Sequence, residues 1–239
     1  MTDYYDDKLA AENLKKCYEL APPRTKQYLL AEIQYVQEQI SSADIVLELG
    51  CGYGRVLSQI VPYCRSLVGI DTSLTSLRLA KSNLSNFLSV QLSQMTACDL
   101  RYADDTFDVV FCIQNGISAF KVDPRALVME AYRVTKPSGL CLFSSYSKKF
   151  WNHRLEWFED QAEAGLLGPI DWHKTKDGLI ACKDGFESST FGEREFLDIT
   201  RSLGIKGRVF EVDESSLFCL IEVEKNDEYS IEPFHQEKA

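Results

Sequence analysis

Three glycines stand at alternate positions, 50, 52 and 54, in the segment ELGCGYGR. The segment follows an apolar run, IVLEL at 45–49, and precedes residues with helical spacing. Glycine adopts positive φ readily and lets a ligand approach the backbone. A parallel strand that ends in such a turn before a helix presents backbone N–H groups at the carboxyl edge of the sheet. Gly50, Gly52 and Gly54 therefore predict a nucleotide-binding site.

The spacing of these glycines separates two kinds of nucleotide site. A dinucleotide fingerprint needs Gly-x-Gly-x-x-Gly, in which the last glycine allows close packing of helix and strand. Gly50 and Gly52 fit that pattern, but Arg55 stands at the third position. The sequence also has no phosphate-binding loop of the Gly-x-x-x-x-Gly-Lys type. An NAD-dependent oxidoreductase is therefore the weaker interpretation of the glycines.

The elements that must position this turn alternate between two periodicities. Short β-rich runs are followed by helical patterns after residue 54, after residue 72 and across 125–134. This alternation predicts an α/β fold with a mostly parallel sheet. The predicted strands lie at 45–49, 66–71, 88–92, 107–113, 139–146, 207–212 and 216–225. Two Asp-Gly pairs within 175–186 predict a small hairpin.

The chain of 239 residues is expected to form a single domain with an ordinary apolar core, because 45% of its residues are hydrophobic. Helical patterns at 8–20 and 24–40 predict a helical cap, broken at two prolines. The expected parts are a cap at 1–41, a ligand-binding core at 42–146, an inserted lid at 147–192, a last helix and strands at 193–224, and a tail at 225–239.

The segment ELGCGYGR resembles motif I of the class I S-adenosylmethionine (SAM)-dependent methyltransferases, whose pattern is acid-x-Gly-x-Gly-x-Gly. VGID, DDTFDVVFC and AYRVTKPSGLCLFSS resemble later motifs of that family, in the family's order, over roughly 45–145. The resemblance implies a Rossmann-like fold with a mostly parallel seven-stranded sheet and helices on both faces. It also implies SAM as the cofactor and S-adenosylhomocysteine as the product.

The resemblance also implies which residues form the cofactor site. It implies that Asp71 binds the ribose hydroxyls, although Asp71 has a capping role as its alternative. Asp99 is expected near the adenine, or else in a plain turn, and Arg24 beside the methionyl carboxylate. Glu48 falls in a strand expected to be buried, where an unpaired carboxylate is costly, so a site role is favoured. The full set is Glu48, Gly50, Cys51, Gly52, Gly54, Asp71, Thr72, Asp99, Leu100, Gln114, Asn115 and Arg24.

The methyl acceptor is expected beyond the fourth strand, at CIQNGISAF. This segment lacks the Asn/Asp-Pro-Pro-Tyr of enzymes that methylate nucleic-acid bases or glutamine, and is loosely similar to glycine and sarcosine N-methyltransferases. Asn115 is the candidate beside the transferred methyl, or else a turn residue. His173 is the candidate base and Tyr146 a wall of the site. The tryptophans at 151, 157 and 172 form either a lid or plain core.

The net charge and the cysteine pattern limit which partners and which compartment we expect. The net charge of −10 disfavours nucleic acid, so a small-molecule acceptor is expected. The eight cysteines form no Cys-x-x-Cys pair, so no metal is expected, and a reducing cytoplasm is the expected compartment. Neither a membrane span nor a secretory signal is expected. A protein or RNA methyltransferase and a non-catalytic SAM-binding protein stay open as alternatives, as does the atom that is methylated.

Overall fold

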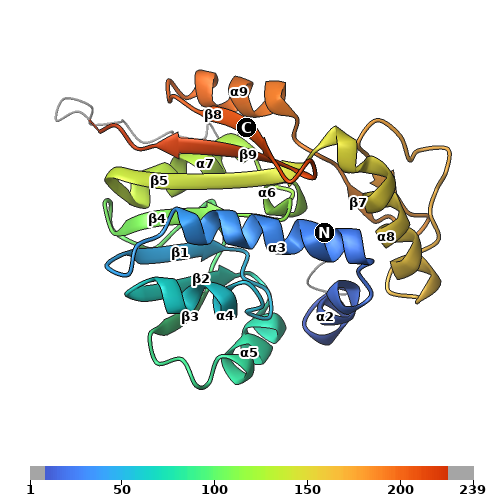
Figure 1. Cartoon of the computed structure of the whole chain (residues 1–239), viewed down its shortest axis with the longest axis horizontal. Coiled ribbons are helices and arrows are strands. Elements are labelled where there is room, and N and C mark those ends of the chain that lie inside the picture. The colour runs from blue at the N-terminus through green and yellow to red at the C-terminus, as the bar shows by residue number, and fades with distance from the viewer. Residues whose placement is uncertain (1–8, 226–239) are drawn as a thin grey trace, which may run out of the picture.

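A computed structural model describes residues 9–225 of the chain. One seven-stranded sheet runs through it, in the order β3-β2-β1-β4-β5-β9-β8. The first five strands pair in parallel, and β9 pairs antiparallel with both β5 and β8. The strands are β1 (Ile45–Leu49), β2 (Ser66–Asp71), β3 (Val90–Gln94), β4 (Phe107–Cys112), β5 (Thr135–Tyr146), β8 (Arg208–Val212) and β9 (Ser216–Glu222). The predicted seven-stranded, mostly parallel α/β fold is confirmed (Figure 1).

Helices cover both faces of the sheet. One apolar cluster joins the sheet to α3 (Pro23–Glu38), α4 (Leu57–Ile60) and α5 (Leu74–Asn83). A second cluster joins the other face to α6 (Gly116–Ala119), α7 (Pro124–Val134) and α9 (Glu193–Ser202). The central strands are buried on both sides, as the continuous apolar runs of β1 and β4 require.

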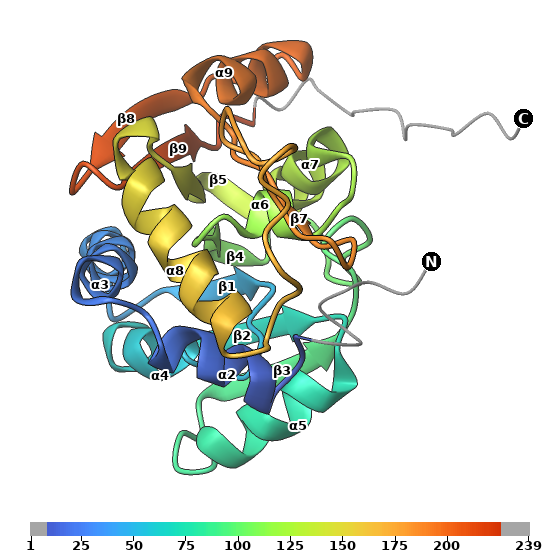
Figure 2. The same cartoon turned by 90° about the vertical axis from the view of Figure 1, so that its right-hand side faces the viewer.

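A third, smaller cluster lies beyond one end of the sheet. It packs α2 (Glu12–Glu19) and the start of α3 against α8 (Trp151–Glu163) and the hairpin of β6 (Ile180–Ala181) with β7 (Glu187–Ser188). Tyr28 stacks near Tyr146 and Phe150 there, and the Trp157 indole donates to the Cys17 carbonyl. In Figure 2, α8 crosses the view in front of the ends of the strands.

Several boundaries differ from the predicted ones for local reasons. β3 begins and ends two residues later than expected, which shifts the loop that follows it. The α-helix after the glycine turn has only four residues. It is followed by a 3-10 turn at Val61–Tyr63, which contains Pro62, a residue that does not fit the interior of an α-helix. α3 begins at Pro23 and ends at Glu38, within two residues of the prediction. The predicted hairpin is present, with Gly185 at φ 95° in its turn.

Candidate cofactor site and the adjoining cavity

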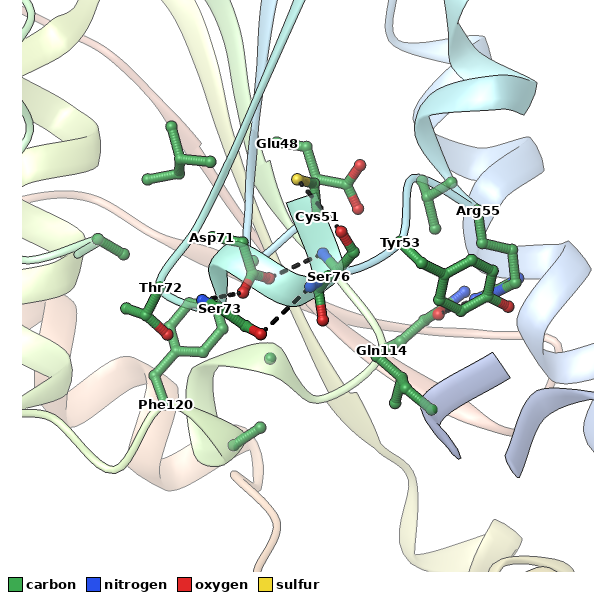
Figure 3. Close-up of a pocket in the computed structure, with 18 of the residues that line it drawn as sticks. Glu48, Cys51, Tyr53, Arg55, Asp71, Thr72, Ser73, Ser76, Gln114 and Phe120 are labelled. Carbon is green, nitrogen blue, oxygen red and sulfur yellow. Dashed lines mark hydrogen bonds between the residues drawn. The ribbon is translucent and has the colours of Figure 1, made fainter. Parts of the chain in front are cut away.

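A cavity of about 190 Å³ opens where β1, β2, β3 and β4 end (Figure 3). Parallel strands of an open sheet leave such a crevice at their carboxyl edge, where the strand order reverses between β1 and β4. The expected residues that line it are Glu48, Gly50, Cys51, Gly52, Asp71, Thr72 and Gln114.

The first part of the wall is the glycine turn after β1. Gly50 has φ 74°, and the backbone N–H groups of Gly50 and Cys51 both donate to the Ile70 carbonyl, at 2.9 and 2.8 Å. A Cβ atom on Gly50 would lie 2.4 Å from Cζ of Phe120. Both the left-handed backbone and this close approach therefore require glycine.

Gly54 has a different role from the one expected. It does not line the cavity, and a Cβ there would lie 2.7 Å from Leu84 Cδ1 and 3.2 Å from Ala80 Cβ. Because Leu84 and Ala80 belong to α5 and its end, Gly54 lets the turn pack against that helix. This corrects the prediction that all three glycines face the ligand.

Asp71 lies at the end of β2 and organises two backbone segments. Its Oδ2 accepts from the Gly52 N–H at 2.8 Å, and its Oδ1 accepts from the Ser73 N–H at 2.8 Å. Ser73, rather than Asp71, is the N-cap of α5, since its Oγ accepts from the Ser76 N–H. Asp71 thus ties the glycine turn to β2 while its carboxylate lines the cavity.

Glu48 and Arg55 bring a carboxyl and a guanidinium to the same cavity. Glu48 is 5% exposed, and burial raises the pKa of its carboxyl to about 8, with nearby Arg55 opposing and Asp71 adding to the shift. The Arg55 guanidinium lies 4.1 Å from the ring centroid of Tyr18 and donates to Oε1 of Gln114. Oε2 of Glu48 and Nε of Arg55 are buried and make no hydrogen bond. These two atoms are enclosed by protein, while the side chains of both residues also line the cavity.

Two consecutive residues after β4 adopt left-handed backbone conformations, Gln114 at φ 59° and Asn115 at φ 64°. The Gln114 N–H donates to Glu32 Oε2 at 2.6 Å and to Ser144 Oγ at 2.8 Å. The Asn115 side chain donates to the Ser189 carbonyl at 2.9 Å and accepts from Ser145 Oγ at 2.7 Å. Asn115 therefore ties β4 to β5 and to the loop after β7.

The structure corrects two expectations about the adenine side. Asp99 is exposed and does not line the cavity. Met95, Thr96 and Ala97 occupy that wall instead, and they were missed because none of them is acidic. Leu100 is buried in the core, where its N–H donates to Glu130 Oε2 at 2.8 Å.

Two further expected residues lie away from the cavity. Arg24 donates to the Asp213 carboxylate at 2.7 Å and to the Asp213 carbonyl at 2.6 Å, so its guanidinium is already paired. His173 is exposed in the loop before β6 and lines neither cavity, which removes it as the base. Tyr4 and Tyr5, near the start of the predicted helical cap, lie outside the described residues.

A second cavity, of about 50 Å³, adjoins the first. Leu9, Leu14, Tyr18, Gln114 and Ala119 line both, so the two spaces share a wall. The remaining wall of the smaller cavity is mainly aromatic and comes from β5, α8 and the hairpin. It includes Asn115, Tyr146, Trp157, Phe158 and Phe186. Trp157 and Phe158 are buried, whereas Trp172 is 58% exposed and takes no part.

Within residues 9–225 no group of three or more histidine, cysteine, aspartate or glutamate side chains is arranged to hold a metal ion. No helix in that range combines the length and apolar character that a membrane crossing requires. The candidate site is therefore described by the two cavities and their walls.

A parallel sheet with an antiparallel β9 between β5 and β8, and a glycine turn after β1, defines the class I methyltransferase fold. Residues 46–139 match the family model of a methyltransferase domain. Residues 46–139 of the chain therefore form a methyltransferase domain with the class I SAM-dependent fold, and SAM is the cofactor of that family.

Individual proteins of this family are similar to the chain over only part of their length. The chain is 30% identical over 173 residues to an arsenite methyltransferase of Aquipseudomonas alcaligenes, covering 66% of this chain and 48% of that protein. It is 28% identical over 119 residues to a ubiquinone biosynthesis O-methyltransferase of Pseudomonas savastanoi pv. phaseolicola, covering 48% and 50%. The chain thus spans about half the length of these curated relatives.

A solved structure gives the same fold over nearly the whole chain. A putative SAM-dependent methyltransferase of Methanococcus maripaludis superposes with a TM-score of 0.65 at 14% identity, covering 96% of this chain and 100% of that one. Its likeness extends beyond the methyltransferase-domain match, into the cap and the region after β5.

Proposed function

We propose that this protein transfers a methyl group from SAM to a small-molecule acceptor. The observation that carries the proposal is the pair of adjoining cavities, one glycine-edged and charged, the other small and aromatic, with Gln114 and Tyr18 in their common wall. A cofactor bound in the first cavity and an acceptor bound in the second cavity would lie next to each other beside these shared residues. The named relatives act on arsenite and in ubiquinone biosynthesis, which also favours small acceptors.

The cofactor fits the first cavity by its polar groups. Gly50 and Gly52 leave the turn open to it, and Asp71 offers a carboxylate on the β2 side. Glu48 and Arg55 offer a carboxyl and a guanidinium on the β1 side. SAM supplies a methyl group on a sulfonium, which is already activated for displacement. The bond from sulfur to the methyl carbon breaks as the bond from the acceptor forms, and S-adenosylhomocysteine leaves.

The protein's own contribution is positioning and exclusion of water. Gln114 and Asn115 are fixed in left-handed conformations at the boundary between the cavities, so the wall at the reacting atoms is rigid. Alignment of this kind contributes up to ~7–11 kcal/mol to a displacement. Trp157, Phe158 and Phe186 line the acceptor side with apolar surface.

Tyr146 is the polar group that we assign to the acceptor side. Burial raises the pKa of its phenol above the usual value, with Arg154 opposing that shift. The hydroxyl therefore stays protonated at neutral pH, where it orients an acceptor as a hydrogen-bond donor rather than removing a proton from it. We assign no catalytic contact to Asn115, because its side chain is bonded to Ser145 and Ser189.

We propose a cytoplasmic location and no nucleic-acid partner. All eight cysteines are free thiols in the structure, as in a reducing compartment. The net charge of −10 opposes a phosphate backbone.

The test is methyl transfer from SAM labelled in the methyl group. The purified protein is incubated with separate pools of small amines, thiols, phenols and arsenite, and with total RNA and a protein extract. We expect label in a product from one small-molecule pool, together with S-adenosylhomocysteine. Label in RNA or protein alone would overturn the small-molecule assignment. Binding of S-adenosylhomocysteine without transfer to any pool would favour the non-catalytic alternative.

A further inference from the structure

A carboxyl and a guanidinium lie in the cofactor cavity without pairing to each other. Glu48 and Arg55 both line it, yet among residues 9–225 no ion pair joins them. Each keeps one buried polar atom without a hydrogen bond, Oε2 of Glu48 and Nε of Arg55. Figure 3 shows Asp71 and Arg55 on opposite sides of the pocket, with Glu48 and Cys51 between them. Protein atoms enclose these two atoms, but both side chains also line the cavity, where a ligand can reach their remaining polar atoms.

Arg55 is held by contacts that leave one terminal nitrogen, Nη1, without a hydrogen bond to the described part of the chain. Its guanidinium stacks on Tyr18 of α2 at 4.1 Å and donates through one terminal nitrogen to Gln114 Oε1. A planar guanidinium presents several donors in a fixed fork, so two contacts that fix its plane still leave donors for a carboxylate.

Gln114 is in turn held by α3. Its Nε2 donates to the Leu29 carbonyl at 3.3 Å, and its backbone N–H donates to Glu32 Oε2 at 2.6 Å. Glu32 is 0% exposed and also accepts from Ser144 Oγ at 2.8 Å and from Ser216 Oγ. The carboxylate thereby joins α3 to the ends of β4, β5 and β9. With the backbone of Gln114 fixed, its side-chain oxygen is aimed at Arg55.

We propose that Arg55 binds the methionyl carboxylate of the cofactor, and that Glu32 is a positioning residue that holds Arg55 in place through Gln114. The inference rests on the proposed cofactor. It replaces Arg24, whose guanidinium is bonded to Asp213. It also links the cap helix α3 to cofactor affinity, although Glu32 lines neither cavity.

The test compares two ligands that differ only in the carboxylate, S-adenosylhomocysteine and its decarboxylated analogue, by calorimetric titration. The wild-type protein should bind S-adenosylhomocysteine about 10- to 100-fold more tightly, as a charge-assisted hydrogen bond predicts. Arg55→Met should reduce its affinity to that of the analogue and leave the analogue within about twofold. Arg55→Lys should restore part of the preference, because the charge is kept.

Glu32→Gln should weaken binding of S-adenosylhomocysteine by about three- to tenfold and leave binding of the analogue unchanged. In the Arg55→Met background it should cause no further loss of affinity. Thr25→Val, which removes a buried hydroxyl from the same helix, and Arg24→Met are the matched controls and should keep the preference. An equal loss of both ligands in Glu32→Gln would make Glu32 merely structural and overturn its positioning role.

Equal binding of the two ligands by the wild-type protein, or an unchanged preference in Arg55→Met, would overturn the role of Arg55. Failure of the wild-type protein to bind S-adenosylhomocysteine at all would instead reject the proposed cofactor. The two failures are therefore distinguishable.

Discussion

The two cavities share a wall but are built in different ways. Most residues that line the cofactor cavity come from the ends of β1, β2, β3 and β4 and the turns that follow them, and its two acidic residues, Glu48 and Asp71, lie within one residue of a strand end. The acceptor cavity is assembled from α2, the end of β5, α8 and the hairpin, which lie far apart in the sequence. The first is set by backbone geometry, and the second by packing of large side chains.

This difference predicts different responses to substitution. Changes at the cofactor cavity should alter backbone conformation or charge, and so act strongly on S-adenosylhomocysteine binding. Changes at the acceptor cavity should alter its shape alone and spare that binding. Four substitutions test the contrast, each with S-adenosylhomocysteine as the probe or with unfolding of the free protein.

The largest effect is expected from Gly50→Ala. The new Cβ would lie 2.4 Å from the Phe120 ring on a backbone at φ 74°, so we expect a loss of affinity of about 100-fold or more. Gly165→Ala is the matched control, because Gly165 has φ 71° but no atom within 4 Å of a Cβ. Comparable losses of affinity in both variants would show that backbone strain, rather than the position of Gly50 in the cavity, weakens binding.

Asp71→Ala should weaken binding by about 10- to 100-fold, because it removes a charged acceptor from the cavity and frees the Gly52 N–H. Asp99→Ala should bind like the wild-type protein, since Asp99 is exposed and outside the cavity. Calorimetric titration gives both values. Reversal of this order would restore Asp99 to the site.

Glu48→Gln should change the pH dependence of stability. The pKa of Glu48 is about 8 in the folded protein and near 4.5 when exposed, so the folded state keeps a proton that the unfolded state loses. Rising pH between these values therefore favours unfolding of the wild-type protein.

Relative to wild type, Glu48→Gln should gain on the order of 1 kcal/mol in unfolding free energy for each pH unit across that window. Urea unfolding without ligand at pH 5, 6.5 and 8 measures the gain. Glu32 has a pKa of about 7 and titrates in the same window. Because Glu32 is present in both proteins, its contribution cancels in the difference between their unfolding free energies. A constant difference between them at all three pH values would contradict the assignment.

The smallest effect on the cofactor is expected from Trp157→Phe. The indole lines the acceptor cavity and donates to the Cys17 carbonyl at 2.8 Å. Affinity for S-adenosylhomocysteine should stay within about twofold, while KM for the acceptor found in the transfer assay should rise. His173→Ala, at an exposed loop, should change neither quantity. A marked loss of cofactor affinity in Trp157→Phe would remove the contrast between the cavities.

The parts that were predictable from the sequence are those that local rules fix. The glycine turn at 50–54 and the acid at the end of β2 follow from strand ends and φ requirements, and alternating periodicity gives the sheet. Asp99 was misplaced because the wall after β3 is formed by Met95, Thr96 and Ala97, which directly follow that strand and include no acid. Arg24 was misplaced because its partner, Asp213, is 189 residues away. Glu32 carried no local signal, since its three donors come from β4, β5 and β9.

The central claim, a SAM site at the carboxyl edge of the sheet, is tested most directly by titrating the purified protein with SAM, S-adenosylhomocysteine and NAD in parallel. We expect micromolar binding of both adenosyl ligands with one site per chain and none of NAD. A folded sample that binds neither adenosyl ligand, or that binds NAD in preference, would contradict the account.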